Sequence, residues 1–153
     1  MKISFFGHRN FINDQNYEKR VLEILFEIEN SNQGEQLELL LGGYGSFDKF
    51  ALQCARKFKA SVKNVTITLV TPYIIHGDTE EYDIVLYPSL ENVPKKFAIT
   101  HRNRRMVDIS DLIIAFIDHK FGGAYDAVKY AKSKNKTIVN LSDFEIYYKK
   151  GTE

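Results

Sequence analysis

The sequence has 153 residues, of which 44% are hydrophobic and 27% are charged, without a low-complexity tract. This length and composition exclude a disordered or fibrous chain and predict one domain over residues 1–153. Lys and Arg number 21 against 20 Asp and Glu, so no overall positive field draws the protein to nucleic acid or an anionic membrane. A single cysteine excludes an internal disulfide, and the first residues lack a signal-peptide pattern, which together favour a cytoplasmic protein.

The first half of the chain alternates short apolar runs with amphipathic stretches. Residues 3–6 are a short, mainly apolar run closed by a glycine, which is typical of a buried parallel strand. Residues 17–29 repeat apolar side chains at helical spacing and predict an amphipathic helix. Residues 37–41 predict a second buried strand, and a helix follows directly. Residues 65–70, VTITLV, are rich in β-branched side chains and predict a third strand.

The middle of the chain is less regular. Residues 71–94 contain glycine, prolines and an acidic patch, so we expect an irregular, lid-like excursion with one short strand at residues 83–87. A helix is predicted from Pro94 to about Asp108, because a proline costs nothing in the first turn of a helix.

The last part of the chain completes the pattern. Residues 112–117 and 137–141 predict two buried strands with a small-residue helix between them, while residues 143–153 fit either an edge strand or a docking segment. Strands that alternate with helices predict a Rossmann-like three-layer α/β/α fold with a mainly parallel sheet. We expect five strands in the order 3-2-1-4-5. Ligands of such sheets bind at the carboxyl ends of the strands, here at the switch point between strands one and four.

Glycines follow three of the predicted strands, in FFGHR, LLLGGYGSFDKF and FIDHKFGGAYDA. Along one sheet edge, glycine lets the backbone approach a ligand, and the N–H groups of the next helix favour an anion such as phosphate. A glycine after a strand also makes an ordinary tight turn, so each turn alone has two interpretations. Ser46 and Asp48 suit the start of a helix, but the Ser46 hydroxyl equally suits a phosphate or sugar. Three glycine turns on one edge favour a ligand site.

The segment HRNRRMVD concentrates guanidinium groups just before a buried strand. Helical spacing places Arg102, Arg105 and Met106 on one face and Arg104 on another. Only part of the cluster can therefore contact a single ligand. An Arg fork suits a phosphate or a carboxylate, and Asn103 adds an amide for a base or a ribose. The alternative is a solvated, charged helix face.

Other reactive side chains give weaker signals. Cys54 lies on an apolar helix face and is interpreted as a buried structural thiol. His8 follows the first glycine turn, where it can touch a phosphate. The four histidines form no HxxH or HxxxH pair and the carboxylates are scattered, so the sequence predicts no metal site and no cofactor.

Four segments, GHRNF, GGYGSFDKFA, RNRRMVDISDLIIAF and GGAYDAVKYAKSKNKTIVNL, together resemble the SLOG superfamily, especially its YpsA/YoqJ-like branch. The resemblance covers nearly the whole chain. It implies a Rossmann-like fold that binds a nucleotide or an ADP-ribose-like small molecule, and a homodimer or larger homo-oligomer. It also implies catalytic relatives, the LOG phosphoribohydrolases, and distant DprA relatives that suggest single-strand nucleic-acid binding.

The catalytic LOG motif, a proline-led GGxGT followed by a glutamate, is incomplete here. The glutamate position holds Lys49 after the first double glycine, and the second offers Val128 and Lys129. N-glycosidic cleavage needs a carboxylate close to the ribose. Asp48 or Asp126 can substitute from a neighbouring position, but each is expected to point about 100° around its helix from the position of the missing glutamate. Binding or sensing of a nucleotide-type ligand is therefore the leading hypothesis. Phosphoribohydrolase-type cleavage is the alternative, and single-strand nucleic-acid binding comes third.

We expect Arg102, Gly122 and Gly123 to contact the anionic part of the ligand. Residues 42–46 and Asp48 are expected to shape the side that holds a sugar or a second phosphate. The candidate ligand-binding residues are Gly7, His8, Arg9, Gly42, Gly43, Gly45, Ser46, Asp48, Arg102, Asn103, Met106, Gly122, Gly123, Ala124 and Tyr125.

Overall fold

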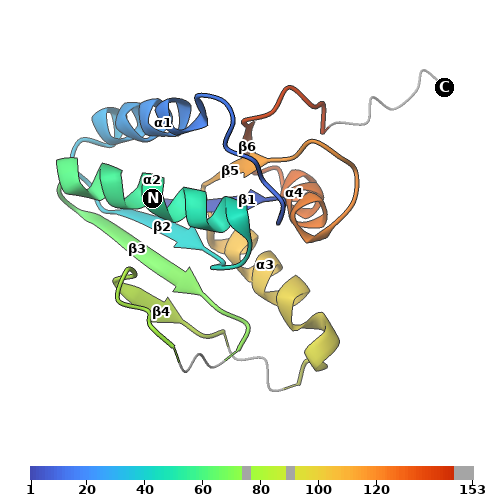
Figure 1. The fold of residues 1–153 in the computed structure, drawn as a ribbon. Helices are drawn as coiled ribbons and strands as arrows, with labels where there is room; N and C mark the ends of the chain where they lie inside the picture. The colour runs from blue at the N-terminus through green and yellow to red at the C-terminus, as the bar shows by residue number, and fades with distance from the viewer. Residues whose placement is uncertain (74–76, 89–91, 147–153) are drawn as a thin grey trace.

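The computed structural model describes residues 1–73, 77–88 and 92–146 (Figure 1). Strands and helices alternate along these residues as β1 (Lys2–Gly7), α1 (Tyr17–Asn32), β2 (Leu37–Leu41), α2 (Ser46–Ser61), β3 (Val65–Val70), β4 (Ile84–Leu86), the 3₁₀ turn η1 (Lys95–Phe97), α3 (Ala98–Ile109), β5 (Leu112–Phe116), α4 (Gly123–Ser133) and β6 (Thr137–Asn140). Parts of the predicted excursion and of the C-terminal tail lie outside the described residues.

The six strands form one sheet in the order β4-β3-β2-β1-β5-β6, and every neighbouring pair is parallel. The predicted order of five strands is confirmed, because those strands are β3, β2, β1, β5 and β6. The short strand expected at residues 83–87 is β4, which extends the sheet beyond β3. In the middle of the sheet, Ser4 pairs with Leu40 on one side and with Ile113 on the other, so β1 is central.

Apolar side chains on both faces of the sheet explain why these segments form buried strands. In β2, Leu39 and Leu41 belong to the core on one face, and Leu40 belongs to the core on the other. Because side chains alternate along a strand, a continuous apolar run fills both cores at once. Helices α1 and α2 cover the first face, and α3 and α4 cover the second, which confirms the three-layer α/β/α architecture (Figure 1).

Two helix details refine the sequence-based expectations. Pro94 does not begin an α-helix, because its extended backbone leads into η1, and α3 begins only at Ala98. Cys54 is buried on the inner face of α2, and burial raises the pKa of its thiol to about 12, which agrees with a structural role for this cysteine.

Among the described residues, the structure contains no helix of the length and apolar character that crossing a bilayer requires.

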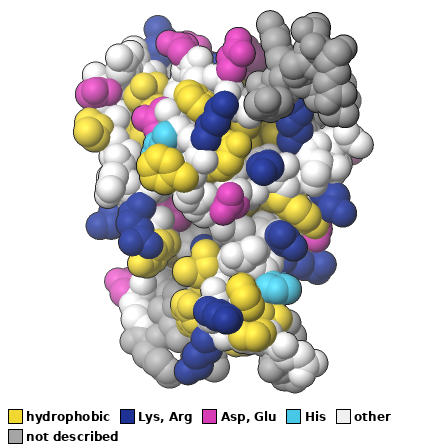
Figure 2. Space-filling model, turned by 90° about the vertical axis from the view of Figure 1, so that its right-hand side faces the viewer, with side chains coloured by type: hydrophobic (Ala, Val, Ile, Leu, Met, Phe, Trp, Pro, Cys, Tyr) yellow, Lys and Arg dark blue, Asp and Glu magenta, His cyan; other side chains and the backbone are white. Residues whose placement is uncertain are grey.

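The surface carries mixed charge. On the face drawn in Figure 2, Lys and Arg side chains stand in separate groups among acidic and hydrophobic ones. The described residues of that face therefore carry no continuous basic band.

Candidate functional site

A pocket of about 640 Å³ opens at the carboxyl ends of β1, β2 and β5. Its wall is formed by the connection after β1, the turn into α2, the first half of α3 and the loop between β5 and α4. The position is the predicted switch point, where connections on the two sides of β1 run to opposite faces of the sheet. Gly7, Gly42 and Gly122 all line this pocket, which confirms that the three strand-end glycines gather on one edge.

Most of the predicted binding residues lie in this wall, namely Gly7, His8, Arg9, Gly42, Asp48, Arg102, Asn103, Gly122, Gly123 and Ala124. The remaining ones, Gly43, Gly45, Ser46, Met106 and Tyr125, are not part of it.

These other residues have structural roles. The Ser46 hydroxyl donates to the Arg9 carbonyl at 2.6 Å and lies 2.9 Å from the Phe11 carbonyl, so it ties the loop after β1 to the start of α2. Met106 is fully buried in the core under α3 and α4, and Tyr125 packs against the same core. Their side chains are therefore committed to packing, which helical spacing alone did not reveal.

Both helices that begin at the pocket start after a glycine of positive φ. Gly45 before α2 has a φ of 90°, and Gly122 before α4 has a φ of 96°, a backbone conformation that other residues rarely adopt. A Cβ on Gly45 would lie 2.9 Å from the Arg9 Cα, so that glycine permits two segments to approach closely. A Cβ on Gly122 would meet nothing within 4 Å. The start of α4 is therefore open to a ligand.

Gly7 has a different reason to be glycine. A Cβ at this position would lie 2.1 Å from the Cγ of Phe47, whose side chain is fully buried. The end of β1 thus presses directly against the first turn of α2. Packing alone requires this glycine, whether or not a ligand also approaches it.

Arg102 is buried and holds the carboxyl ends of two strands together. Its Nη1 donates to the carbonyls of Gly42 at 3.0 Å and Val70 at 2.9 Å, and its Nε donates to Asn103 at 2.8 Å. The guanidinium therefore lies on the β2 side of the pocket. From the sequence we expected Arg102 to contact the same anionic group as Gly122 and Gly123. The side chain nearest to a Cβ on Gly123 is instead that of Asn103.

The other arginines of α3 point outward. Arg104 is exposed, as predicted, with its guanidinium 5.1 Å from the centre of the Tyr130 ring. Arg105 is exposed too, although helical spacing places it near Arg102 and Met106, because the buried face of α3 is narrower than these three positions. Neither Arg104 nor Arg105 lines the pocket.

Asp48 is the buried carboxylate of the pocket. Its Oδ2 accepts a hydrogen bond of 2.7 Å from the backbone N–H of Tyr44. Burial raises the pKa of Asp48 to about 6, although that N–H and the charge of Arg102 both oppose the rise. Lys49 is exposed and lies outside the pocket wall, as does Asp126. Asp48, one of the predicted site residues, therefore lies in the pocket wall, because α2 begins with its third residue turned toward the sheet edge.

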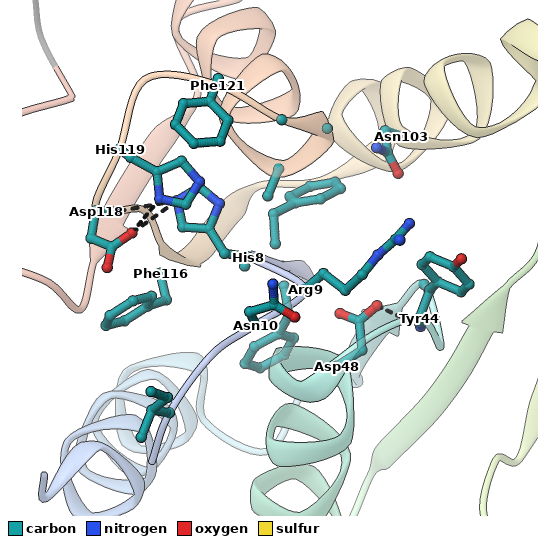
Figure 3. A pocket seen from close by; sticks show the side chains of 18 of the residues that line it. His8, Arg9, Asn10, Tyr44, Asp48, Asn103, Phe116, Asp118, His119 and Phe121 are labelled. Atoms are coloured by element: carbon teal, nitrogen blue, oxygen red, sulfur yellow. Dashed lines mark hydrogen bonds and ion pairs between the residues drawn. The ribbon is translucent and has the colours of Figure 1, made fainter. Parts of the chain in front are cut away.

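Exposed rings line the rim of the pocket (Figure 3). The Tyr44 ring is 56% exposed and packs under the guanidinium of Arg9, which lies 4.6 Å from the ring centre. Phe121 is 70% exposed and packs on the ring of His119, with the two centres 4.1 Å apart. Neither aromatic residue was among the predicted site residues, although each lies within two residues of a predicted glycine turn.

Two histidines and one aspartate meet beside these rings. The rings of His8 and His119 stack with centres 3.4 Å apart, and Asp118 Oδ1 lies 2.6 Å from His119 Nδ1. Burial and the neighbouring His119 lower the pKa of His8, although Asp118 opposes the change. A search for short histidine spacings could not find this cluster, because adjacent strands β1 and β5 bring it together from distant parts of the sequence.

No protein-family model matches the sequence, and no curated protein matches it. Solved structures do resemble the fold. TM1055, a structural-genomics target, gives a TM-score of 0.56 at 14% identity over 90% of this chain and 71% of that chain. DNA processing protein A from Helicobacter pylori, described for its single-stranded DNA binding mode, gives 0.58 at 17% identity, with coverages of 94% and 66%.

DNA processing protein A (DprA) from Streptococcus pneumoniae gives a TM-score of 0.66 at 16% identity, and the match covers 95% of this chain. The chain spans 66% and 52% of the two DprA chains, so it corresponds to only part of those proteins. DprA is one of the relatives that the sequence resemblance implied. At these identities the comparisons show that the chain has the Rossmann-like fold of these structures.

Proposed function

We propose that this protein binds a nucleotide or a nucleotide-derived ligand, such as an ADP-ribose-like molecule, in the pocket at the switch point. The observation that carries the proposal is the open start of α4 facing exposed aromatic rings across one cavity of about 640 Å³. Small-molecule sites usually measure roughly 300–1,000 Å³, so the cavity has room for such a ligand. The resemblance to the SLOG superfamily points to the same ligand class.

The phosphate end of the ligand belongs at the start of α4. The first N–H groups of a helix have no partner within the helix, and the helix dipole favours negative charge there. Gly123 and Ala124 line the pocket at this point, and the absence of a side chain at Gly122 leaves the approach open. The exposed guanidinium of Arg9 on the same pocket wall supplies a positive charge for a second phosphate.

The base and sugar belong near the rim and the β2 side. Tyr44 and Phe121 offer ring faces on which a base can stack, and stacking tolerates different bases. Asn103 offers an amide for a base edge, and the Asp48 carboxylate can accept a hydrogen bond from a ribose hydroxyl.

The proposal is tested by a thermal-shift screen against AMP, ADP, NAD⁺ and ADP-ribose. A ligand that binds only the folded protein raises its stability by mass action, by about 2.7 kcal/mol at a hundredfold excess over Kd. A rise in Tm with ADP or ADP-ribose, but not with inorganic sulfate at equal ionic strength, is the expected result. No rise with any of these compounds contradicts the proposal.

Asp48 favours cleavage of an N-glycosidic bond as a second candidate function. A pocket carboxyl with a pKa of about 6 can donate or accept a proton near neutral pH, and it can stabilise an oxocarbenium-like centre. Free base released from AMP by the wild type, and lost in Asp48→Asn, is the result that supports this function. Asp126→Asn is the matched control, because it removes an exposed carboxylate from the first turn of α4.

Single-stranded nucleic acid is the weaker third option. The Helicobacter pylori protein is described as binding single-stranded DNA, but its likeness at 17% identity concerns the fold. The net charge of +1 and the scattered basic groups in Figure 2 favour a small ligand over a polyanion. Oligonucleotide binding that weakens steeply with salt, without any response to mononucleotides, would favour nucleic acid instead.

From the same superfamily resemblance we also propose that the protein forms a homodimer or a larger homo-oligomer. Light scattering that gives the single-chain mass of 17.7 kDa at micromolar concentration contradicts this proposal.

A further inference from the structure

Two imidazoles and a carboxylate converge on the β5 side of the pocket (Figure 3). Gly7 at the end of β1 pairs with Phe116 at the end of β5, and the His8 N–H continues the pairing to the Phe116 carbonyl. His8 therefore emerges from the sheet next to Asp118 and His119. Adjacent parallel strands fix this meeting, so it is a property of the fold rather than of one flexible loop.

We propose that His8, Asp118 and His119 form a binding site for a divalent transition-metal ion, with Zn²⁺ as the best match. Each residue offers one ligand atom, and these atoms all lie within 4.8 Å of one another. Two imidazole nitrogens and one carboxylate oxygen suit Zn²⁺ or a similar ion, whereas Mg²⁺ and Ca²⁺ prefer oxygen ligands alone. Three protein ligands with an open position are typical of zinc sites that also bind a water or a substrate.

The distances fit such a site after two changes at His119, a wider contact with Asp118 and a turn of the ring. His8 Nε2 and Asp118 Oδ1 lie 3.4 Å apart. Metal bonds of about 2.0–2.1 Å in tetrahedral geometry place neighbouring ligand atoms about 3.4 Å apart. The His119 Nδ1 to Asp118 Oδ1 distance of 2.6 Å is that of a hydrogen bond, in which a proton occupies the place between the two ligands. Metal binding must therefore widen this one contact, and the proton between the two ligands moves to Nε2, the other ring nitrogen of His119.

Metal binding requires Asp118 and His119 to move, and both side chains are exposed enough to do so. The ring of His119 has to turn out of its stack with His8, so that its nitrogen lone pair points to the same place as the other two ligands. The side chains of Asp118 and His119 are 53% and 36% exposed, whereas the side chain of His8 is only 8% exposed. The site thus has one fixed ligand and two adjustable ones.

The buried ligand is already in the form that binds a metal. His8 Nε2 accepts a hydrogen bond of 3.1 Å from the backbone N–H of Asp118, so this nitrogen carries a lone pair rather than a proton. This lone pair points toward Asp118. It can be donated to a metal ion instead, at the cost of that one hydrogen bond.

The open position of the metal faces the ligand pocket. All three ligands line that pocket, as do Gly122 and Gly123 at the start of α4. A water or a phosphate oxygen on the metal would therefore lie inside the cavity. The metal site does not depend on the proposed nucleotide function, because the ion is held by protein atoms and is measured without any nucleotide.

The test is a calorimetric titration of the chelator-treated protein with Zn²⁺, accompanied by the visible absorption spectrum of the Co²⁺ form. We expect one ion per chain and Co²⁺ absorption bands of a four- or five-coordinate site. His119→Ala and Asp118→Asn should each weaken binding about tenfold or more, since even partners of metal ligands have effects of that size. Thermal unfolding of each variant shows that it is folded, which the exposure of both side chains leads us to expect.

His101→Ala is the matched control, because it removes an exposed imidazole from α3 that is not part of the cluster. It should bind Zn²⁺ like the wild type. The proposal is overturned if the wild type shows no saturable binding, or if His119→Ala and Asp118→Asn both bind as tightly as His101→Ala.

Discussion

The guanidinium of Arg102 donates a hydrogen bond to the carbonyl of Gly42 over 3.0 Å, so an arginine from α3 holds the glycine turn that follows β2. A second bond from the same nitrogen reaches the carbonyl of Val70 at the end of β3. Arg102→Ala would leave both carbonyls without this donor, at a cost of about 1–3 kcal/mol for each buried group. We therefore expect a loss in the free energy of unfolding of about 2 kcal/mol or more, measured by urea denaturation.

Arg104→Ala is the control for that measurement. Its side chain is exposed on the same helix and contacts the Tyr130 ring, so its removal should change the unfolding free energy by less than about 0.5 kcal/mol. Equal effects of the two substitutions would show that Arg102 does not hold the strand ends together.

Gly7→Ala should destabilise the protein through overpacking. The added methyl group would lie 2.1 Å from the ring of Phe47, which is fully buried and cannot move aside without disturbing the core. Overpacking of this kind costs about 1–3 kcal/mol, which a lowered Tm would report. Gly123→Ala should keep its Tm, because the new methyl group would meet only the Asn103 amide at 4.0 Å. A Tm for Gly7→Ala equal to that of the wild type would rule out the close packing of β1 on α2.

Asp48 should make stability depend on pH in the acid range. Its pKa is about 6 in the folded protein against an ordinary value of 3.8 for aspartate, so the folded state binds more protons than the unfolded state between these two pH values. The stability from this group is therefore present at low pH and lost as the pH rises through the window, by up to about 3 kcal/mol. Because Asp48 is buried at the pocket, this cost at neutral pH marks it as a candidate functional group.

The difference in unfolding free energy between Asp48→Asn and the wild type isolates this effect, since asparagine does not titrate. The unfolding free energy of the variant should rise relative to that of the wild type as the pH increases from about 4 to about 6. Little further change is expected up to pH 8. A difference that stays flat across this range would mean that the carboxyl is not buried as described.

The sequence predicted the sheet well and the pocket chemistry only in part. An apolar run such as that of β5 identifies a buried strand on its own. The alternation of strands with helices then leaves few possible sheet topologies, which is why the predicted strand order was correct. The site depends on side-chain direction and on contacts between distant segments. The hydrogen bond that Asp48 accepts from the Tyr44 N–H, and those that Arg102 donates to two carbonyls, follow from how α2 and α3 dock, which spacing along one helix does not reveal.

The cluster of His8, Asp118 and His119 also depends on contacts between distant segments, which spacing in the sequence does not reveal. His8 and His119 are far apart in the sequence, and the pairing of β1 with β5 makes them neighbours. A pattern search finds ligands that are close in sequence, whereas a parallel sheet gathers residues from the ends of separate strands. The strand-end position of both residues was the available signal.

The central claim is that a nucleotide-type ligand binds with its phosphate at the start of α4, and calorimetry with ADP-ribose or ADP on three proteins tests it most directly. Gly123→Ala leaves the fold room for its methyl group but places it in the pocket wall where the phosphate should lie, so its affinity should fall about tenfold or more. Gly34→Ala is strained by its φ of 79° yet lies outside the pocket, so it should lose stability and keep wild-type affinity. Wild-type affinity in Gly123→Ala, or binding lost equally in both variants, would contradict the claim.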